Sequence, residues 1–224
     1  MSIERITTAL VAGSLEPVTL AEVKSHLRVT HAEDDVYIVT LITAARSLFE
    51  RLTRRAIPKQ DVVLALDAFP GMRMPWWDGE VDGALASYQR RAIDLAMAPT
   101  ISVTEVASYD LTNTRLVFAS TNYFLEKADP NIPGRVCLNI GAIWPVNLRR
   151  ADAVEILFKA GYENGAVPAE IRVAILMLIA HLYANRGEAD DVAVHESGAY
   201  SFLRQFMVMR PGTRAIRDDR ERTY

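Results

Sequence analysis

The stretch PAEIRVAILMLIAHLYANR, residues Pro168–Arg186, decides the fold because its pattern predicts one long buried helix. Pro168 suits the first helical position, where its missing N–H costs nothing, and Gly187 stands where a helix commonly ends. Apolar residues lie on nearly all faces of this helix, so we expect it to be covered on several sides. Its core positions recur at helical spacing: Ile171, Ile175, Leu178 and Leu182.

A membrane span is the rival interpretation of this stretch. Arg172 and His181 interrupt the apolar run well short of the about 20 residues that a bilayer requires. We therefore expect a helix inside a protein core, with no membrane contact.

Two more helices are predicted nearer the N-terminus. Residues 1–17 show no lasting period and are interpreted as an arm or a short extended segment. The sequence TLAE at 19–22 is a capping box, in which Thr19 and Glu22 each accept the backbone N–H of the other, and it opens a short helix to about 27. A longer helix then runs to about residue 55, with a cap at Thr30, Asp34 or Asp35. Its apolar seam contributes three more core residues: Ile38, Ile42 and Phe49.

From about residue 57 the apolar period changes from helical to two, which is typical of strands. Strands are expected at 62–66, 92–97, 101–109, 115–118, 123–126, 135–138 and 153–159, and a long loop at 69–83. A polar connector (187–198) and a final short helix (199–209) follow the main helix. The fold class is therefore α+β: a discontinuous helical bundle domain (1–56 and 163–209), an inserted β-rich domain (57–162) and a flexible charged C-terminal tail (210–224).

Length and charge limit the function classes. A chain of 224 residues that is 50% hydrophobic can bury a sizeable core in one or two domains. A net charge of −3 argues against a protein that binds nucleic acid over its whole surface, although a local basic patch is compatible with it. The single cysteine, Cys137, excludes an internal disulfide and a Cys-rich zinc site. The first ten residues lack the pattern of a secretion signal.

No stretch of the sequence predicts catalysis. The segment DGEVDG at 78–83 copies the start of a calcium loop, but position twelve is Gln89 and no helix pattern precedes it. His181 is expected to be a hydrogen-bonded core residue, and Cys137 a small buried hydrophobe within a strand. The four histidines do not form a zinc-protease pair, and no phosphate-binding loop occurs. We therefore expect neither an enzyme nor a cofactor.

The remaining features concern contact with other macromolecules. Trp76 and Trp77 stand in the long loop as a candidate partner-binding patch, with burial against the loop itself as the alternative. The tail is slightly basic, and we expect it to order on a protein partner rather than on nucleic acid.

Three stretches resemble the head-to-tail connector, or adaptor, proteins of long-tailed bacteriophages and gene transfer agents. They are VTLAEVKSHLRV at 18–29 with the helix after it, the segment from Trp144-Pro145 to Tyr162, and the stretch from Val167 to Arg186. Their order and spacing together cover most of residues 18–186. The resemblance does not extend to the Trp76-Trp77 loop or to the residues beyond Met209.

The resemblance implies a virion protein of the particle neck, assembled in the cytoplasm of the host bacterium. Such a protein forms a homo-oligomeric ring, typically of twelve subunits, between the portal and a stopper or tail-completion protein, and DNA passes through the lumen without sequence-specific binding. It also implies a C-terminal segment that reaches into the portal. No family pattern identifies the residues of that segment, and our own candidates for the role are in the tail: Arg210, Arg214, Arg217, Arg220 and Tyr224.

Two other functions remain open from the sequence. One is a DNA-contacting packaging factor that uses the tail together with Arg51, Arg54 and Arg55. The other is a metal-assisted hydrolase with Asp78, Glu80 and Asp82 as ligands. The subunit number, the choice between phage and gene transfer agent, and the face that meets each partner also remain open.

Overall fold

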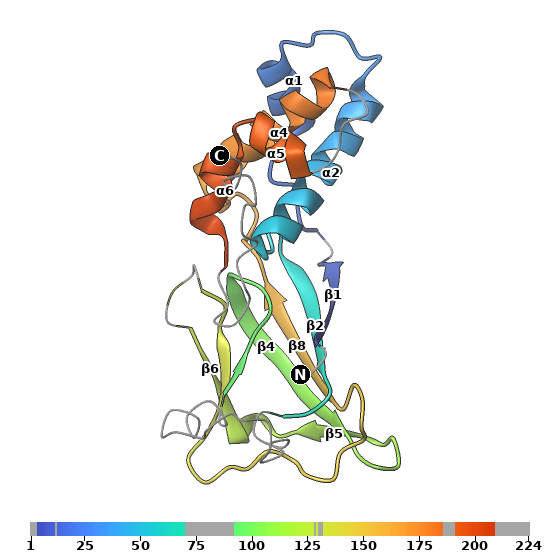
Figure 1. Cartoon of the computed structure of the whole chain (residues 1–224), viewed down its shortest axis with the longest axis vertical. Coiled ribbons are helices and arrows are strands. Elements are labelled where there is room, and N and C mark those ends of the chain that lie inside the picture. The colour runs from blue at the N-terminus through green and yellow to red at the C-terminus, as the bar shows by residue number, and fades with distance from the viewer. Residues whose placement is uncertain are drawn as a thin grey trace, which may run out of the picture.

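Helices gather at one end of an elongated molecule and strands at the other (Figure 1). The structure, a computed structural model, describes residues 4–11, 13–69, 92–127, 129, 132–185 and 191–208. The chain has an α+β fold, as the sequence predicts.

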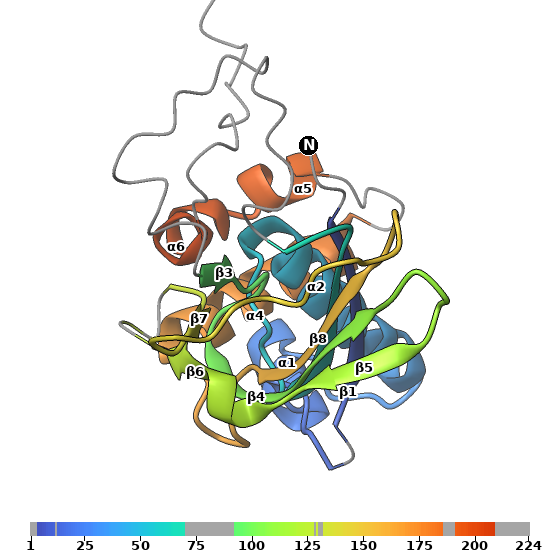
Figure 2. The same cartoon turned by 90° about the horizontal axis from the view of Figure 1, so that it is seen from below.

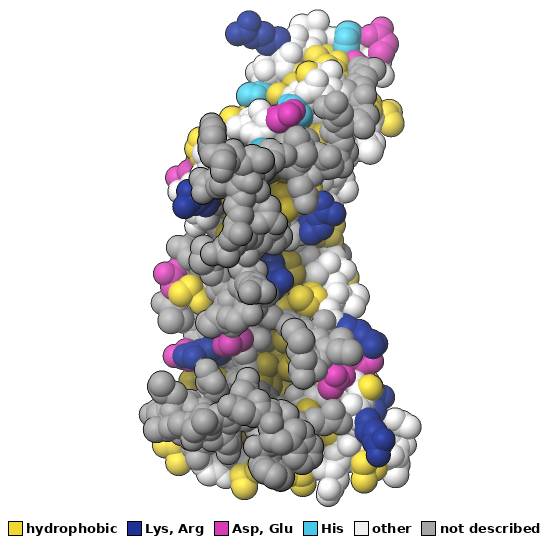
Figure 3. Space-filling view, in the orientation of Figure 1, with side chains coloured by type: hydrophobic (Ala, Val, Ile, Leu, Met, Phe, Trp, Pro, Cys, Tyr) yellow, Lys and Arg dark blue, Asp and Glu magenta, His cyan; other side chains and the backbone are white. Residues whose placement is uncertain are grey.

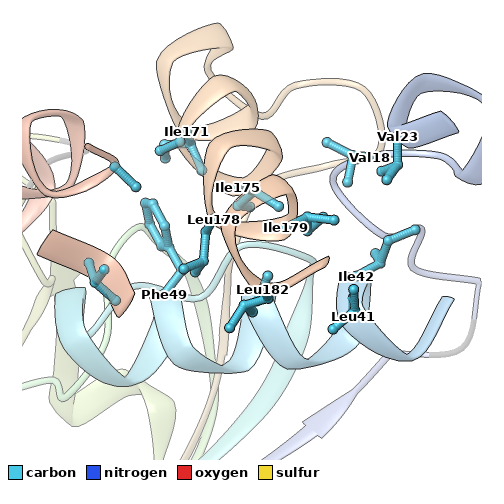
Figure 4. Packing of buried hydrophobic residues seen from close by; sticks show 14 of the residues in the cluster. Val18, Val23, Leu41, Ile42, Phe49, Ile171, Ile175, Leu178, Ile179 and Leu182 are labelled. Atoms are coloured by element: carbon cyan, nitrogen blue, oxygen red, sulfur yellow. The ribbon is translucent and has the colours of Figure 1, made fainter. Parts of the chain in front are cut away.

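The helical part is built from both ends of the chain. It contains α1 (Leu20–Leu27), α2 (Asp35–Thr53), α4 (Ala169–Ala184), α5 (Asp191–Glu196) and α6 (Tyr200–Phe206). Helix α4 packs on α2, and Phe49 of α2 lies beside Leu178 of α4 in the core between them (Figure 4). The seven core residues predicted on these two helices are each at most 5% exposed: Ile38, Ile42, Phe49, Ile171, Ile175, Leu178 and Leu182.

The local signals at the start of α1 explain why it begins where it does. The Thr19 hydroxyl accepts the Glu22 N–H at 3.3 Å, and the Glu22 carboxylate accepts the Thr19 N–H at 2.8 Å. This reciprocal pair satisfies two backbone donors that the helix itself leaves open. The capping box predicted at 19–22 is confirmed.

Two antiparallel sheets form the other part of the described chain. A five-stranded sheet has the order β1-β2-β8-β4-β5, and a three-stranded sheet has the order β3-β7-β6. Figure 2 shows the strands from below, with β5 along one side of the molecule. The strands are β1 (Glu4–Leu10), β2 (Gln60–Leu66), β3 (Ala92–Asp94), β4 (Thr100–Tyr109), β5 (Arg115–Phe118), β6 (Tyr123–Glu126), β7 (Arg135–Leu138) and β8 (Val154–Ala160); a short 3-10 turn, Ser120–Asn122, precedes β6.

A second hydrophobic core lies among these strands. Along β8 every second side chain is buried, as its period of two predicts. Trp144 also packs here, stacked on Phe69 with ring centroids 4.6 Å apart. The helical core and this second core lie on either side of the segments through which the chain passes between helices and sheets.

Several predicted boundaries were wrong. Pro168 is the N-cap rather than the first helical residue, because its carbonyl accepts the Arg172 N–H at 3.2 Å while its own backbone is extended. Helix α4 ends at Ala184, and Gly187 lies outside the described residues. The helix is covered on several sides, as expected, although Val173 is 42% exposed.

The predicted ends of α2 and of the polar connector also differ from the structure. Helix α2 stops at Thr53 because Arg54 adopts a left-handed conformation with φ 56°. The connector at 187–198 contains α5, in which Val194 is buried in the helical core. Packing on α4 thus outweighs the polar composition of that segment.

The N-terminal arm is a strand of the larger sheet. Its residues pair antiparallel with β2 over the full length, from Glu4 opposite Leu66 to Leu10 opposite Gln60. Residues 4–10 therefore join the sheet, although they precede the helices in sequence. The division of the chain into separate domains stays a prediction.

Candidate functional site

The contact residues predicted from the sequence lie mostly outside the described part of the chain. This holds for Trp76 and Trp77, for the calcium-like segment at 78–83, and for the tail residues: Arg210, Arg214, Arg217, Arg220 and Tyr224. Their roles stay predictions. Among the described residues, the buried charged side chains lie at the junction between the helices and the sheets.

One largely buried carboxylate, that of Glu50, organises the helix–sheet junction. We define this junction by five residues: Glu16, Arg46, Glu50, Ile57 and Gln60. One oxygen of Glu50 accepts the Ile57 N–H at 2.9 Å and the Gln60 side-chain amide at 2.6 Å. Its other oxygen accepts Nη1 of Arg46 at 2.9 Å, and Nε of Arg46 donates to Glu16 at 2.8 Å. Helix α2, the start of β2 and the segment before α1 are therefore joined through charge-assisted hydrogen bonds.

Burial controls the titration of this carboxylate. The Glu50 side chain is 13% exposed, and desolvation raises its pKa above the usual value. The hydrogen bond from Ile57 N–H and the charge of Arg46 act in the opposite direction but do not cancel the effect of burial. A polar network whose members are all paired favours one arrangement, so we expect this junction to hold α2 and β2 in a fixed relation.

A second crossing of the chain runs beside the first. Gly161 follows β8 with φ 111°, and its N–H donates to the Pro99 carbonyl at 2.9 Å. The next N–H, of Tyr162, donates to the Ile57 carbonyl at 3.0 Å. A Cβ at position 161 would collide with the backbone of Pro58, so only glycine permits this close approach. Two chain crossings are thus locked side by side.

The packaging-factor alternative assigns DNA binding to three arginines at the end of α2. They do not share one exposed surface: Arg51, Arg54 and Arg55. Arg55 is only 1% exposed, and its Nε donates to the Phe206 carbonyl at 2.7 Å. The helix ends before this residue, and the chain turns it inward. Arg55 therefore cannot take part in the proposed DNA contact, because a buried guanidinium cannot reach a phosphate, whereas Arg51 and Arg54 are exposed and their role stays a prediction.

The charged side chains of the described residues that are visible in Figure 3 do not form a single basic field. Basic and acidic side chains are scattered along the described surface in Figure 3. Several of them are paired, as in the ion pair between Arg135 and Glu126 at 2.7 Å. Such a mixed surface gives little attraction for a polyanion.

Apolar side chains are exposed at the helical end of the molecule. Val36 is 81% and Val39 49% exposed on α2, and Leu15, before α1, is 64% exposed. Leu15, Val39 and Thr43 line an open hollow of about 270 Å³. An exposed apolar surface of this kind is typical of a protein contact.

The opposite end carries another apolar surface, on the loop 139–148. Ile140 is fully exposed and Ile143 is 78% exposed. The loop is held in place, because Trp144 is buried and the Asn139 side chain donates to the Thr121 carbonyl at 2.7 Å. The described part of the chain therefore presents exposed apolar side chains at both of its ends.

Residues with catalytic potential are placed in structural roles. His181 is largely buried, with its ring nitrogens 3.3 Å from the Asn185 side-chain amide. Burial, with the nearby carboxylate of Glu126, raises the pKa of the Cys137 thiol to about 11, so this thiol stays protonated at neutral pH. Within the described ranges, no three His, Cys, Asp or Glu side chains are grouped to hold a metal ion. No helix among the described residues has the length and apolar character needed to cross a bilayer.

Comparison with known proteins adds a family and a fold. Residues 17–73 match the family model described as phage gp6-like head-tail connector protein. No curated protein matches the chain.

Three similar solved structures come from gene transfer agent (GTA) particles. A chain from the neck of an empty GTA particle computed with C6 symmetry is 22% identical, with a TM-score of 0.66 over 93% of this chain and 100% of that chain. A chain from the virion of a native particle is 23% identical, with a TM-score of 0.66 over 93% and 97% of the two chains. A chain from a native neck computed with C12 symmetry is 22% identical, with a TM-score of 0.61 over 90% and 99%.

These matches confirm the resemblance found in the sequence. Residues 17–73 carry the sequence pattern of the phage head-tail connector family, and the chain as a whole has the fold of proteins from gene transfer agent particles and their necks.

Proposed function

We propose that this chain is a structural adaptor of a phage or phage-like particle. It forms a ring in the neck, between the portal and a stopper or tail-completion protein, and DNA passes through the lumen. The observation that carries this proposal is the shared fold over 93% of this chain and 100% of a chain from a GTA neck, together with the connector pattern at 17–73.

The ring is supported by the symmetry of the similar structures. Their necks were computed with C6 and C12 symmetry, and we propose twelve subunits for this chain. A ring of identical subunits needs two different complementary surfaces on each subunit. The exposed apolar side chains of α2, including Val36 and Val39, are suitable for one of them.

A structural role needs surfaces and stiffness rather than reactive groups. The helix–sheet junction supplies stiffness, because Glu50 and Arg46 bind one another and both adjoining segments. The tail is the proposed portal-binding segment, and the Trp76-Trp77 loop is a second proposed contact. No catalysis and no cofactor are part of this proposal.

Reconstitution with the portal tests this function. The purified chain is mixed with the portal protein of the same particle and examined by sedimentation and electron microscopy. We expect a ring seated on one face of the portal, and a chain truncated after Met209 that keeps its fold but no longer attaches. Full-length chain that remains apart from the portal at micromolar concentration would refute the proposal.

A further inference from the structure

The last described residues lie along the end of α2. Helix α6 ends at Phe206, and the N–H of Val208 donates to the Thr53 carbonyl at 3.1 Å. Figure 1 shows α6 at the lower end of the helical part, next to the crossing into the strands. The chain therefore enters its tail from the region where helices and sheets meet.

A buried arginine holds the end of α6 in this position. Nε of Arg55 donates to the Phe206 carbonyl at 2.7 Å, and the guanidinium carbon lies 5.5 Å from the centre of the Phe206 ring. A positive charge is favourable at the C-terminal carbonyls of a helix, and a guanidinium over an aromatic ring adds a cation–π attraction. Arg55 thus binds both the backbone and the side chain of the final helical residue.

The same side chain also reaches the second chain crossing. Nη1 of Arg55 lies 3.2 Å from the Tyr162 hydroxyl, on the segment that leads into α4. The Arg55 backbone is fixed in turn, because it forms a bridge with Ala98 and its N–H donates to Thr53 Oγ1 at 3.3 Å. One residue therefore connects the end of α2, the approach to α4 and the exit of α6.

Burial of a guanidinium is costly unless hydrogen bonds compensate it, so this position has a strict geometric requirement. Lysine has one compact ammonium and lacks the planar group that contacts Phe206 and Tyr162 together. An apolar residue would leave the Phe206 carbonyl without this donor. The geometry explains why arginine, and neither lysine nor leucine, suits this place.

We propose that Arg55 is a clamp that fixes the point at which the tail leaves the folded body, and thereby strengthens binding of the tail to its partner. A binding segment that starts from a fixed point loses less conformational freedom on association than one that starts from a loose helix. This inference rests on the proposed function, in which the tail binds the portal. Arg55 acts as a positioning residue and need not touch the portal itself.

Hydrogen exchange tests the clamp without any partner. In Arg55→Met we expect the Val208 amide and the last amides of α6 to exchange about tenfold faster or more, because a charged hydrogen bond is lost, while amides of α4 keep their protection. Arg55→Lys should show an intermediate effect. Arg54→Met, at the exposed neighbouring position, is the matched control and should leave all these amides unchanged.

Portal binding supplies the second measurement. We expect Arg55→Met to weaken attachment about tenfold or more through faster dissociation, with Arg54→Met unaffected. Unchanged exchange at Val208 would overturn the clamp, and faster exchange with unchanged portal affinity would overturn its role in binding. If Arg55→Met fails to fold, the milder Arg55→Lys decides by the same two criteria. Wild-type chain that does not bind the portal contradicts the proposed function, whereas the exchange experiment still judges the clamp.

Discussion

Arg46 and Glu50 stand one turn apart on α2, and their side chains meet at 2.9 Å where the helix approaches the sheet. In an exposed helix this order of charges, with the base before the acid, is the weaker arrangement. Here both side chains are largely buried, and each binds a second segment of the chain. The pair therefore joins the helical part to the start of β2 rather than only supporting the helix.

Replacing Glu50 with glutamine is expected to destabilise the protein at neutral pH by about 1–3 kcal/mol, because one polar partner at the junction is lost. The variant keeps the size of the side chain but presents a neutral amide to Arg46. Urea unfolding measures the change, and Glu163→Gln, at an exposed position that pairs with Lys59, is the control. The control should change the free energy of unfolding by less than about 0.5 kcal/mol.

The stability difference between wild type and Glu50→Gln should depend on pH. Because the pKa of Glu50 is raised in the folded protein, that state takes up the proton first as the pH falls toward the ordinary value of 4.5. Proton uptake by the folded state stabilises that state. The free energy of unfolding of wild type, relative to that of Glu50→Gln, should therefore increase as the pH falls from the raised pKa toward 4.5. A difference that narrows instead would show that the folded-state pKa is lowered.

The capping box of α1 predicts a smaller effect. Thr19→Ala should cost about 1 kcal/mol, because the Glu22 N–H loses its acceptor. Thr40→Ala in the exposed middle of α2 is the control, since its hydroxyl only bonds the Val36 carbonyl within the same helix. Thermal unfolding of both variants measures the difference. Equal melting temperatures for the two variants would contradict the capping role.

Glu22 should respond to pH in the opposite direction from Glu50. Its pKa is lowered, chiefly by the hydrogen bond from the Thr19 N–H and also by the nearby Arg172. A lowered folded-state pKa contributes stability above the unfolded value, and this contribution is lost as the pH falls. In Glu22→Gln that part of the pH dependence should disappear, which a pH series of unfolding curves measures.

Gly161 and Gly165 form a matched pair for the second chain crossing. Both have positive φ, but an added Cβ at 161 meets the Pro58 backbone, whereas at 165 it meets nothing within 4 Å. Gly161→Ala should cost about 3 kcal/mol or more and Gly165→Ala about 1 kcal/mol, because only the first adds a backbone collision to the conformational strain. Chemical unfolding distinguishes them, and equal losses would contradict the close approach.

Binding to duplex DNA should be weak and mostly independent of the exposed helix-end arginines. The packaging-factor alternative instead predicts tight binding with a steep salt dependence, whose slope falls by about 0.9 for each phosphate contact removed. The double variant Arg51→Gln, Arg54→Gln and a chain truncated after Met209 test the two basic segments separately. Tight binding whose slope falls in either variant would favour the alternative over the adaptor.

The sequence predicts elements well where a local signal exists. The capping box at Thr19 and Glu22 marks the start of α1. The strand pattern of the sequence predicts β5, β6 and β7 with the bounds that the structure shows. Helix α5 was missed because its stability comes from Val194 in the helical core, and no periodic run marks it. The partner of β1 was also missed, because its strand pairing with β2 joins residues as far apart in sequence as Glu4 and Leu66, and such pairing leaves no local pattern.

The junction could not be read from the sequence for a similar reason. Arg55 followed other basic residues at a helix end, which is the usual pattern of a solvated helix C-terminus. Its burial depends on Phe206, 151 positions later in the chain. Glu50 likewise resembled one more charged residue of an amphipathic helix, and only the fold brings Gln60 and Glu16 to its network.

The most direct measurement of the central claim is the position of this chain in finished particles. A small folded tag is inserted at the exposed β4–β5 turn, at Asn113, and the neck is reconstructed by electron microscopy with and without the tag. The account predicts extra density repeated around the channel axis in one ring, directly beneath the portal. Tagged particles that assemble normally but show no such density at the neck would contradict it.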